Sequence, residues 1–165
     1  FNIKDFIDEI ERIKMLDNFN SVFICMYWKD ILDNRYVEYY KERGYKIVTA
    51  GHRNDPYFLG RLKDIIDLSD VTMSNSLGTH IGYCLARNKP HYIYNQEPFI
   101  KGARVELEFR QRNNDIYRNS LMLEKKEILD AFATYCNVIT EKQVAVFEKY
   151  WGLNEVKYHF LEKRD

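Results

Sequence analysis

The sequence lacks any run of about 18 apolar residues, the length that a helix needs to cross a bilayer. It also lacks the charged, apolar and small-residue order of a signal peptide, so we expect neither a membrane span nor a signal peptide. The chain has no net charge, because 25 basic residues balance 25 acidic ones. This neutrality argues against nucleic acid as a partner, whereas peripheral contact with a membrane stays open as an expectation.

Cysteine is scarce, with three residues at wide spacing inside apolar segments: Cys25, Cys84 and Cys136. An odd number at such spacing indicates reduced thiols rather than a disulfide framework or a zinc site. His80 and Cys84 are four residues apart, but no further ligands follow at a recognisable spacing, so we expect no metal. We therefore expect a cytoplasmic protein, with the inner face of the membrane as the alternative location.

Several catalytic motifs are also missing. The sequence contains no G-x-S-x-G elbow, no Walker loop, no G-x-G-x-x-G and no H-E-x-x-H. Hydrolase and hydride-transfer activities therefore have no support, and we expect no cofactor.

The sequence does contain short apolar runs that alternate with segments of helical periodicity. The runs predict parallel strands at 21–27, 45–50, 71–73 and 91–94, and the first of them is expected to be buried on both faces. The periodic segments predict helices at 3–16, 30–43, 58–68 and 79–87, with Asp30 as a cap and Gly44 as a left-handed stop. This order predicts an α/β fold, a Rossmann-like parallel sheet flanked by helices.

Beyond Pro98 the pattern predicts helices alone, at 101–112, 115–135 and 141–151. Thr140 and Gln143 form a capping-box signature for the last of these, and Gly152 ends it. We expect one domain over 1–165, with a Rossmann-like core and N-terminal helix in 1–97 and a helical C-terminal extension in 98–165. The chain begins at Phe1 in helical register, so we expect it to be part of a larger, two-domain protein.

Ligands of open parallel sheets bind at the carboxyl ends of the strands, where this chain has polar loops. After the third predicted strand comes Ser74-Asn75-Ser76-Leu77-Gly78-Thr79-His80. Gly78 can let the backbone approach a phosphate, while the Ser76 and Thr79 hydroxyls and the N–H groups of Thr79 and His80 can donate to its oxygens. An ordinary turn glycine at 78 and an ordinary helix cap at Thr79 are equally open interpretations.

Two further loops carry candidate residues. His52 follows the second predicted strand, where it can bind a phosphate or transfer a proton, or be ordinary polar surface. Glu97 follows the fourth, where its carboxylate can accept both ribose hydroxyls or be a solvated residue before Pro98. Tyr27 and Trp28 can stack on a base, line a domain interface or pack in the core.

Four features resemble the nucleotide-sugar-binding, C-terminal half of a glycosyltransferase with the GT-B fold. They are Gly51-His52, the helix end 65–70, the loop 74–79 and Asn88-Lys89-Pro90. Within that fold the chain is similar to bacterial sialyltransferase-like and capsular polysaccharide enzymes, which hold the donor phosphate with a His-Pro pair and a Ser-Ser or Ser-Thr pair. Here Arg53 follows His52, and Asn75-Ser76 replaces the paired hydroxyls.

The resemblance implies a donor-binding domain in the synthesis of surface polysaccharide or glycan. The donor is a CMP- or UDP-linked sugar, the acceptor binds through an absent N-terminal domain, and the isolated chain is expected to be inactive. The implied donor-binding residues are His52, Asn75, Ser76, Gly78, Thr79, His80 and Glu97, with His52 as the one candidate for a catalytic role. Half of a sugar-nucleotide 2-epimerase and a non-catalytic nucleotide-binding or interaction module are the alternatives.

Overall fold

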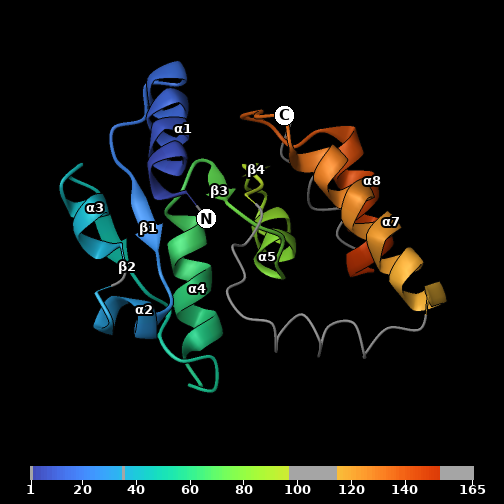
Figure 1. The fold of residues 1–165 in the computed structure, drawn as a ribbon, viewed down its shortest axis with the longest axis horizontal. Helices are drawn as coiled ribbons and strands as arrows, with labels where there is room; N and C mark the ends of the chain where they lie inside the picture. The colour runs from blue at the N-terminus through green and yellow to red at the C-terminus, as the bar shows by residue number, and fades with distance from the viewer. Residues whose placement is uncertain (1, 35, 97–114, 153–165) are drawn as a thin grey trace, which may run out of the picture. The chain divides into compact units, whose positions relative to one another are not determined.

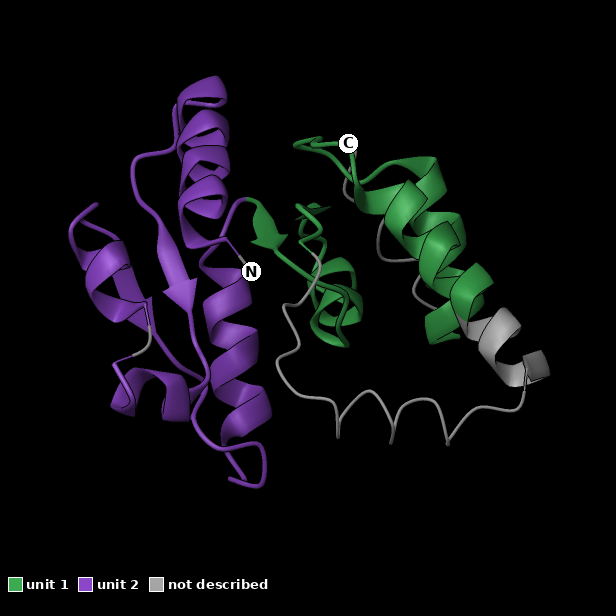
Figure 2. Ribbon diagram, viewed as in Figure 1, with its two compact units in different colours: residues 1, 71–165 green, residues 2–70 purple. Residues whose placement is uncertain are grey.

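The computed structural model describes residues 2–34, 36–96 and 115–152, with the backbone alone for 115–121. The predicted helix at 101–112 lies outside these residues. The chain is mixed α/β, and its internal contacts divide it into two compact units (Figure 2). We call residues 2–70 the N-terminal unit and the part that begins at Val71 the C-terminal unit. Within the described ranges, no helix combines the length and the apolar character needed to cross a bilayer.

The N-terminal unit begins with α1 (Ile3–Leu16), which confirms the predicted helix. The Asn2 side chain accepts a hydrogen bond from the N–H group of Lys4 and so caps the first turn. The residues of α1 at three- and four-residue intervals are buried: Ile3, Phe6, Ile7, Ile10 and Ile13. The apolar stripe of the sequence is therefore the buried face of this helix.

Two strands of the N-terminal unit, β1 (Phe23–Cys25) and β2 (Lys46–Val48), form a parallel pair (Figure 1). Side chains of β1 alternate between exposed Phe23 and Cys25 and half-buried Ile24. The expectation that this strand is covered on both faces is therefore wrong. A continuous apolar run does not specify how many faces are covered, because successive side chains of a strand point to opposite faces.

The predicted helix at 30–43 is in fact two short helices, α2 (Trp28–Leu32) and α3 (Val37–Lys41). Asn34 and Tyr36 between them have φ angles of 51° and 60°, which an α-helix cannot accommodate. Asp30 consequently lies inside α2 rather than at its cap. Gly44 has a φ of 73° and supplies the predicted left-handed stop.

The last helix of the N-terminal unit is α4 (Phe58–Asp67), and the C-terminal unit continues with β3 (Thr72–Ser74), α5 (His80–Ala86) and β4 (His91–Ile93). Strands β3 and β4 (Figure 1) are parallel neighbours, and their register places Thr72 opposite His91. The described strands thus form two parallel pairs. Their union in one Rossmann-like sheet stays a prediction.

Helices α7 (Asp115–Phe132) and α8 (Glu141–Trp151) also belong to the C-terminal unit. Thr140 and Gln143 form the predicted capping box, and Gly152 ends α8 with a φ of 67°. The two helices share a hydrophobic core with α5 and β4, and its buried residues are Ile81, Leu85, Ile93, Ile128, Ala131, Phe132, Val146 and Phe147. The helices predicted as an extension therefore build the core of this unit.

Candidate functional site

The predicted phosphate-binding loop of the C-terminal unit runs from Ser74, the last residue of β3, to His80, the first residue of α5. The Ser76 and Thr79 side chains are exposed, and Asn75 is half-buried. The carbonyl of Asn75 accepts a hydrogen bond from the N–H group of Gln96 at 3.0 Å, which ties the loop to the segment after β4. The loop therefore has two exposed hydroxyl-bearing side chains on an anchored backbone, and the Ser76 hydroxyl donates to Oδ1 of Asn75 at 3.5 Å.

Thr79 is not the side-chain cap of α5. Its backbone angles are already helical, and its side chain makes no capping hydrogen bond. The phosphate-binding interpretation requires a hydroxyl group that is not used for capping, and Thr79 meets this requirement.

Gly78 leaves room for a neighbouring side chain. A Cβ atom at this position would lie 2.6 Å from Nδ1 of His80, closer than real contacts allow. In the structure the absence of a Cβ atom at Gly78 admits the imidazole ring of His80, and close approach of a phosphate to this glycine stays a prediction.

His80 turns this ring toward the interior of the C-terminal unit. Its Nε2 atom is buried and has no hydrogen-bond partner among the described residues. Its ring centroid lies 5.4 Å from that of His91 in an edge-on arrangement. Burial lowers the pKa of His80, so the ring is neutral at pH 7.

His91 is the residue of this site that sequence reasoning missed, since it was assigned only to a strand. It is 1% exposed, and its Nδ1 and Nε2 atoms lie 2.8 Å from Thr72 Oγ1 and 3.0 Å from Ser74 Oγ. Its carbonyl accepts a hydrogen bond from the Gln143 side chain at 3.1 Å. Burial, reinforced by the neighbouring His80, lowers the pKa of His91 to about 3. Hydroxyl residues at 72 and 74, two apart on one strand, were the available signal.

The loop from Ser74 to His80 contains no lysine, arginine, aspartate or glutamate. With His80 and His91 neutral, the loop offers hydrogen-bond donors without a formal charge. The loop suits a phosphate oxygen, or another acceptor, whose negative charge is balanced by a group outside the loop.

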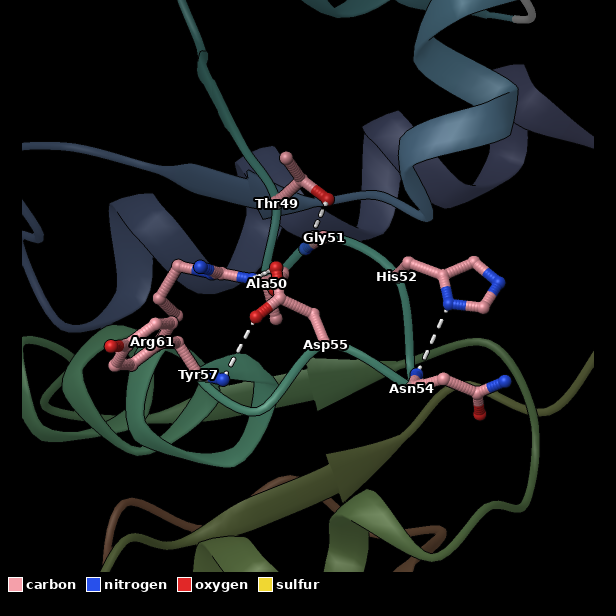
Figure 3. Close-up of polar contacts among 8 residues, drawn as sticks. All are labelled: Thr49, Ala50, Gly51, His52, Asn54, Asp55, Tyr57 and Arg61. Carbon is pink, nitrogen blue, oxygen red and sulfur yellow. Dashed lines mark hydrogen bonds and ion pairs between the residues drawn. The ribbon is translucent and has the colours of Figure 1, made fainter.

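His52 follows β2 in the N-terminal unit, and its side chain is exposed. Figure 3 shows it beside Asn54. The Nδ1 atom of His52 accepts a hydrogen bond from the N–H group of Asn54 at 3.1 Å, so in the neutral ring Nε2 carries the proton. The ring also lies 5.9 Å from that of Trp28. His52 can therefore donate a hydrogen bond to a ligand, and its joint action with Ser76 in the other unit stays a prediction.

An arginine clamp that the sequence did not reveal holds the turn after His52 (Figure 3). Arg61 donates to the Ala50 carbonyl at 2.8 Å and to the Asp55 carboxylate at 2.7 Å. Asp55 also accepts from the N–H group of Tyr57 at 2.8 Å. The hydrogen bond from Arg61, followed by the one from Tyr57, holds the pKa of Asp55 below its usual range.

Gly51 suits this turn for two reasons, its positive φ angle and the close approach of the Arg61 guanidinium. Its φ is 86°, and a Cβ atom there would lie 2.8 Å from Nη2 of Arg61. Gly44 has a φ of 73° with nothing within 4 Å, so Gly44→Ala measures backbone strain alone, about 1–2 kcal/mol. We expect Gly51→Ala to cost about 1 kcal/mol more in chemical denaturation, because Arg61 must give up a hydrogen bond. Equal losses would contradict the clamp.

The remaining predicted residue, Glu97, lies outside the described part of the chain. Among the residues that are described, no group of three or more histidine, cysteine, aspartate or glutamate side chains is placed to hold a metal ion. The described candidate residues are therefore the loop 74–80 with His91 in the C-terminal unit and, separately, the His52 turn in the N-terminal unit.

No family model matches the sequence, and no curated protein or solved structure is significantly similar to it. The resemblance to the GT-B glycosyltransferases therefore rests on residues of this chain alone, chiefly Gly51-His52 and the loop 74–79.

Proposed function

We propose that this chain is the donor-binding part of a nucleotide-sugar-dependent glycosyltransferase, active in surface polysaccharide or glycan synthesis in the cytoplasm or at the inner face of the membrane. The observation that carries the proposal is the loop between β3 and α5. It carries the exposed side chains of Ser76 and Thr79, and Ser74 fixes its turn by donating to the Ser76 carbonyl at 2.9 Å. An exposed pair of hydroxyl donors on an anchored turn suits the phosphate oxygens of a nucleotide.

The local topology supports the same proposal. In each unit a parallel strand pair is joined through helices, β1 to β2 and β3 to β4. Both His52 and the loop 74–80 follow the carboxyl end of a strand, where nucleotides bind in open α/β sheets. The Rossmann-like sheet that would bring the two loops to one edge is part of the proposal.

Within this proposal different side chains bind different parts of the nucleotide-sugar donor. The Ser76 and Thr79 hydroxyls donate to phosphate oxygens, and His52 donates from Nε2 or gives a proton to the leaving phosphate. Such donors stabilise the negative charge that develops on the leaving group when the glycosidic bond to phosphate breaks. Arg53, exposed next to His52, carries a positive charge for a phosphate that binds at the His52 turn.

The test is a calorimetric titration of the 165-residue chain with CMP, UDP, GDP and their sugar conjugates. We expect binding of one nucleotide class, weakened about 10-fold or more by Ser76→Ala and by His52→Ala, because a hydrogen bond to a charged group contributes about 1.5–3 kcal/mol. Ser21→Ala, at an exposed serine outside both loops, is the matched control and should change nothing.

The outcomes separate the proposal from its alternatives. Absence of binding at millimolar concentration for all three nucleotides would overturn the donor site and favour an interaction module. Binding that survives both Ser76→Ala and His52→Ala unchanged would place the nucleotide elsewhere.

A further inference from the structure

His91 spans two neighbouring hydroxyl groups of β3. Because Thr72 lies opposite His91 in the register of β3 and β4, the imidazole reaches Thr72 with Nδ1 and Ser74 with Nε2. The ring is fully buried, with Phe132 and His80 edge-on to it at centroid distances of 6.2 and 5.4 Å. The ring therefore connects the interior of the C-terminal unit to the start of the loop.

The Thr72 and Ser74 hydroxyl groups and a neutral His91 ring do not have enough hydrogen atoms for all four contacts among the two hydroxyls, the ring and the nearby carbonyls. Thr72 Oγ1 lies 2.9 Å from the Pro90 carbonyl, and Ser74 Oγ lies 2.9 Å from the Ser76 carbonyl. If both hydroxyls donated to these carbonyls, both ring nitrogens of His91 would have to donate, and the ring would be a cation. A buried ring beside His80 disfavours that cation, so one hydroxyl must turn toward the ring.

The two carbonyls differ in whether a hydrogen-bond donor remains when the hydroxyl group turns to His91. The Pro90 carbonyl also accepts the N–H group of Thr72 at 2.9 Å, so it keeps a partner when the Thr72 hydroxyl turns to His91. The Ser74 hydroxyl is the one donor to the Ser76 carbonyl among the described residues. The arrangement with fewest losses has Thr72 donating to Nδ1, and Nε2–H of His91 donating to Ser74.

We infer that His91, as its Nε2–H tautomer, is a positioning residue that commits the Ser74 hydroxyl to the Ser76 carbonyl and so fixes the turn that presents Ser76. With Nε2–H occupying a lone pair of Ser74 Oγ, the single Ser74 hydrogen points to the Ser76 carbonyl. The inference rests on the proposed function, which gives the turn its ligand. His91 itself does not touch that ligand.

The first measurement is the tautomer. Two-bond and three-bond couplings between ring protons and nitrogens, recorded on the ¹⁵N-labelled chain at pH 7, distinguish the two neutral forms. We expect Nε2–H at His91. An Nδ1–H ring would overturn the inference, because Ser74 would then donate to the ring and release Ser76.

The second measurement compares Ser74→Ala with Thr72→Val. Each variant removes one hydroxyl group that contacts the His91 ring. Only the Ser74 hydroxyl also bonds to the loop, through the Ser76 carbonyl. We expect Ser74→Ala to accelerate amide exchange at 75–77 at least 5-fold in the ligand-free chain and to weaken nucleotide binding by a similar factor. Thr72→Val should leave both within 2-fold. Equal effects of the two variants, or none from Ser74→Ala, would overturn the inference.

The ligand-free measurements keep this inference separate from the proposed function. If the chain binds none of CMP, UDP and GDP, the proposed function fails, while the tautomer and the amide exchange still decide the role of His91. If the chain binds a nucleotide and Ser74→Ala changes neither exchange nor affinity, the proposed function stands and the role of His91 fails.

Discussion

Phe132→Ala should lower the free energy of unfolding of the C-terminal unit by about 3–5 kcal/mol, the usual cost of removing a buried phenylalanine side chain. Phe132 is 0% exposed at the end of α7, and it belongs to the core that α5, β4, α7 and α8 share. Its ring also lies edge-on to His91. The loss has two parts. The variant gives up the free energy that burial of the aromatic ring supplies, and it leaves an unfilled cavity.

Chemical denaturation of the purified variant measures this loss, and Leu123→Ala is the matched control. Leu123 lies on the same helix but is 69% exposed, so its truncation should change stability by no more than about 0.5 kcal/mol. Similar small losses for both variants would show that α7 does not build the core of this unit.

The second large effect is an acid-induced loss of stability that depends on His91. Burial and the neighbouring His80 lower the pKa of His91 to about 3, whereas the unfolded chain titrates near its ordinary value of 6.5. Between pH 6.5 and about 3 the unfolded state therefore binds a proton that the folded state does not. Stability is complete above pH 6.5 and falls with decreasing pH by up to about 1.4 kcal/mol per unit.

Other groups titrate in the same direction. The pKa of His80 is lowered by burial, and that of Asp55 by Arg61, so both also reduce stability as the pH falls. The comparison is therefore wild type against His91→Gln, which keeps a donor and an acceptor but does not titrate. Urea denaturation from pH 8 to pH 4 should give a shallower pH dependence for the variant. Parallel curves would contradict a neutral, buried His91.

Several elements could be predicted because their determinants are local. The helix α1 follows from apolar residues at three- and four-residue intervals, and the capping box of α8 needs only Thr140 and Gln143. Gly44 and Gly152 adopt the predicted left-handed angles, because glycine meets no steric penalty there. The loop 74–80 is likewise predicted by small polar residues between a strand and a helix.

Other features depend on segments far apart in the sequence. The break between α2 and α3 places Asn34 and Tyr36 in the left-handed region, although nothing in their spacing required it. The exposed side chains of β1 show that an apolar run does not specify its coverage. Both errors arose because tertiary contacts override local preference in short segments.

The sequence by itself determined most of the order of helices and strands, the capping box of α8 with the glycine stops, and the position of the polar loops, because these depend on neighbours within a few residues. The tertiary structure decided that His91 lies between Thr72 and Ser74 and that Gln143, 52 positions away, holds its carbonyl. It also made α7 and α8 part of the core. Strand register and burial bring these groups together, and neither is encoded in local spacing.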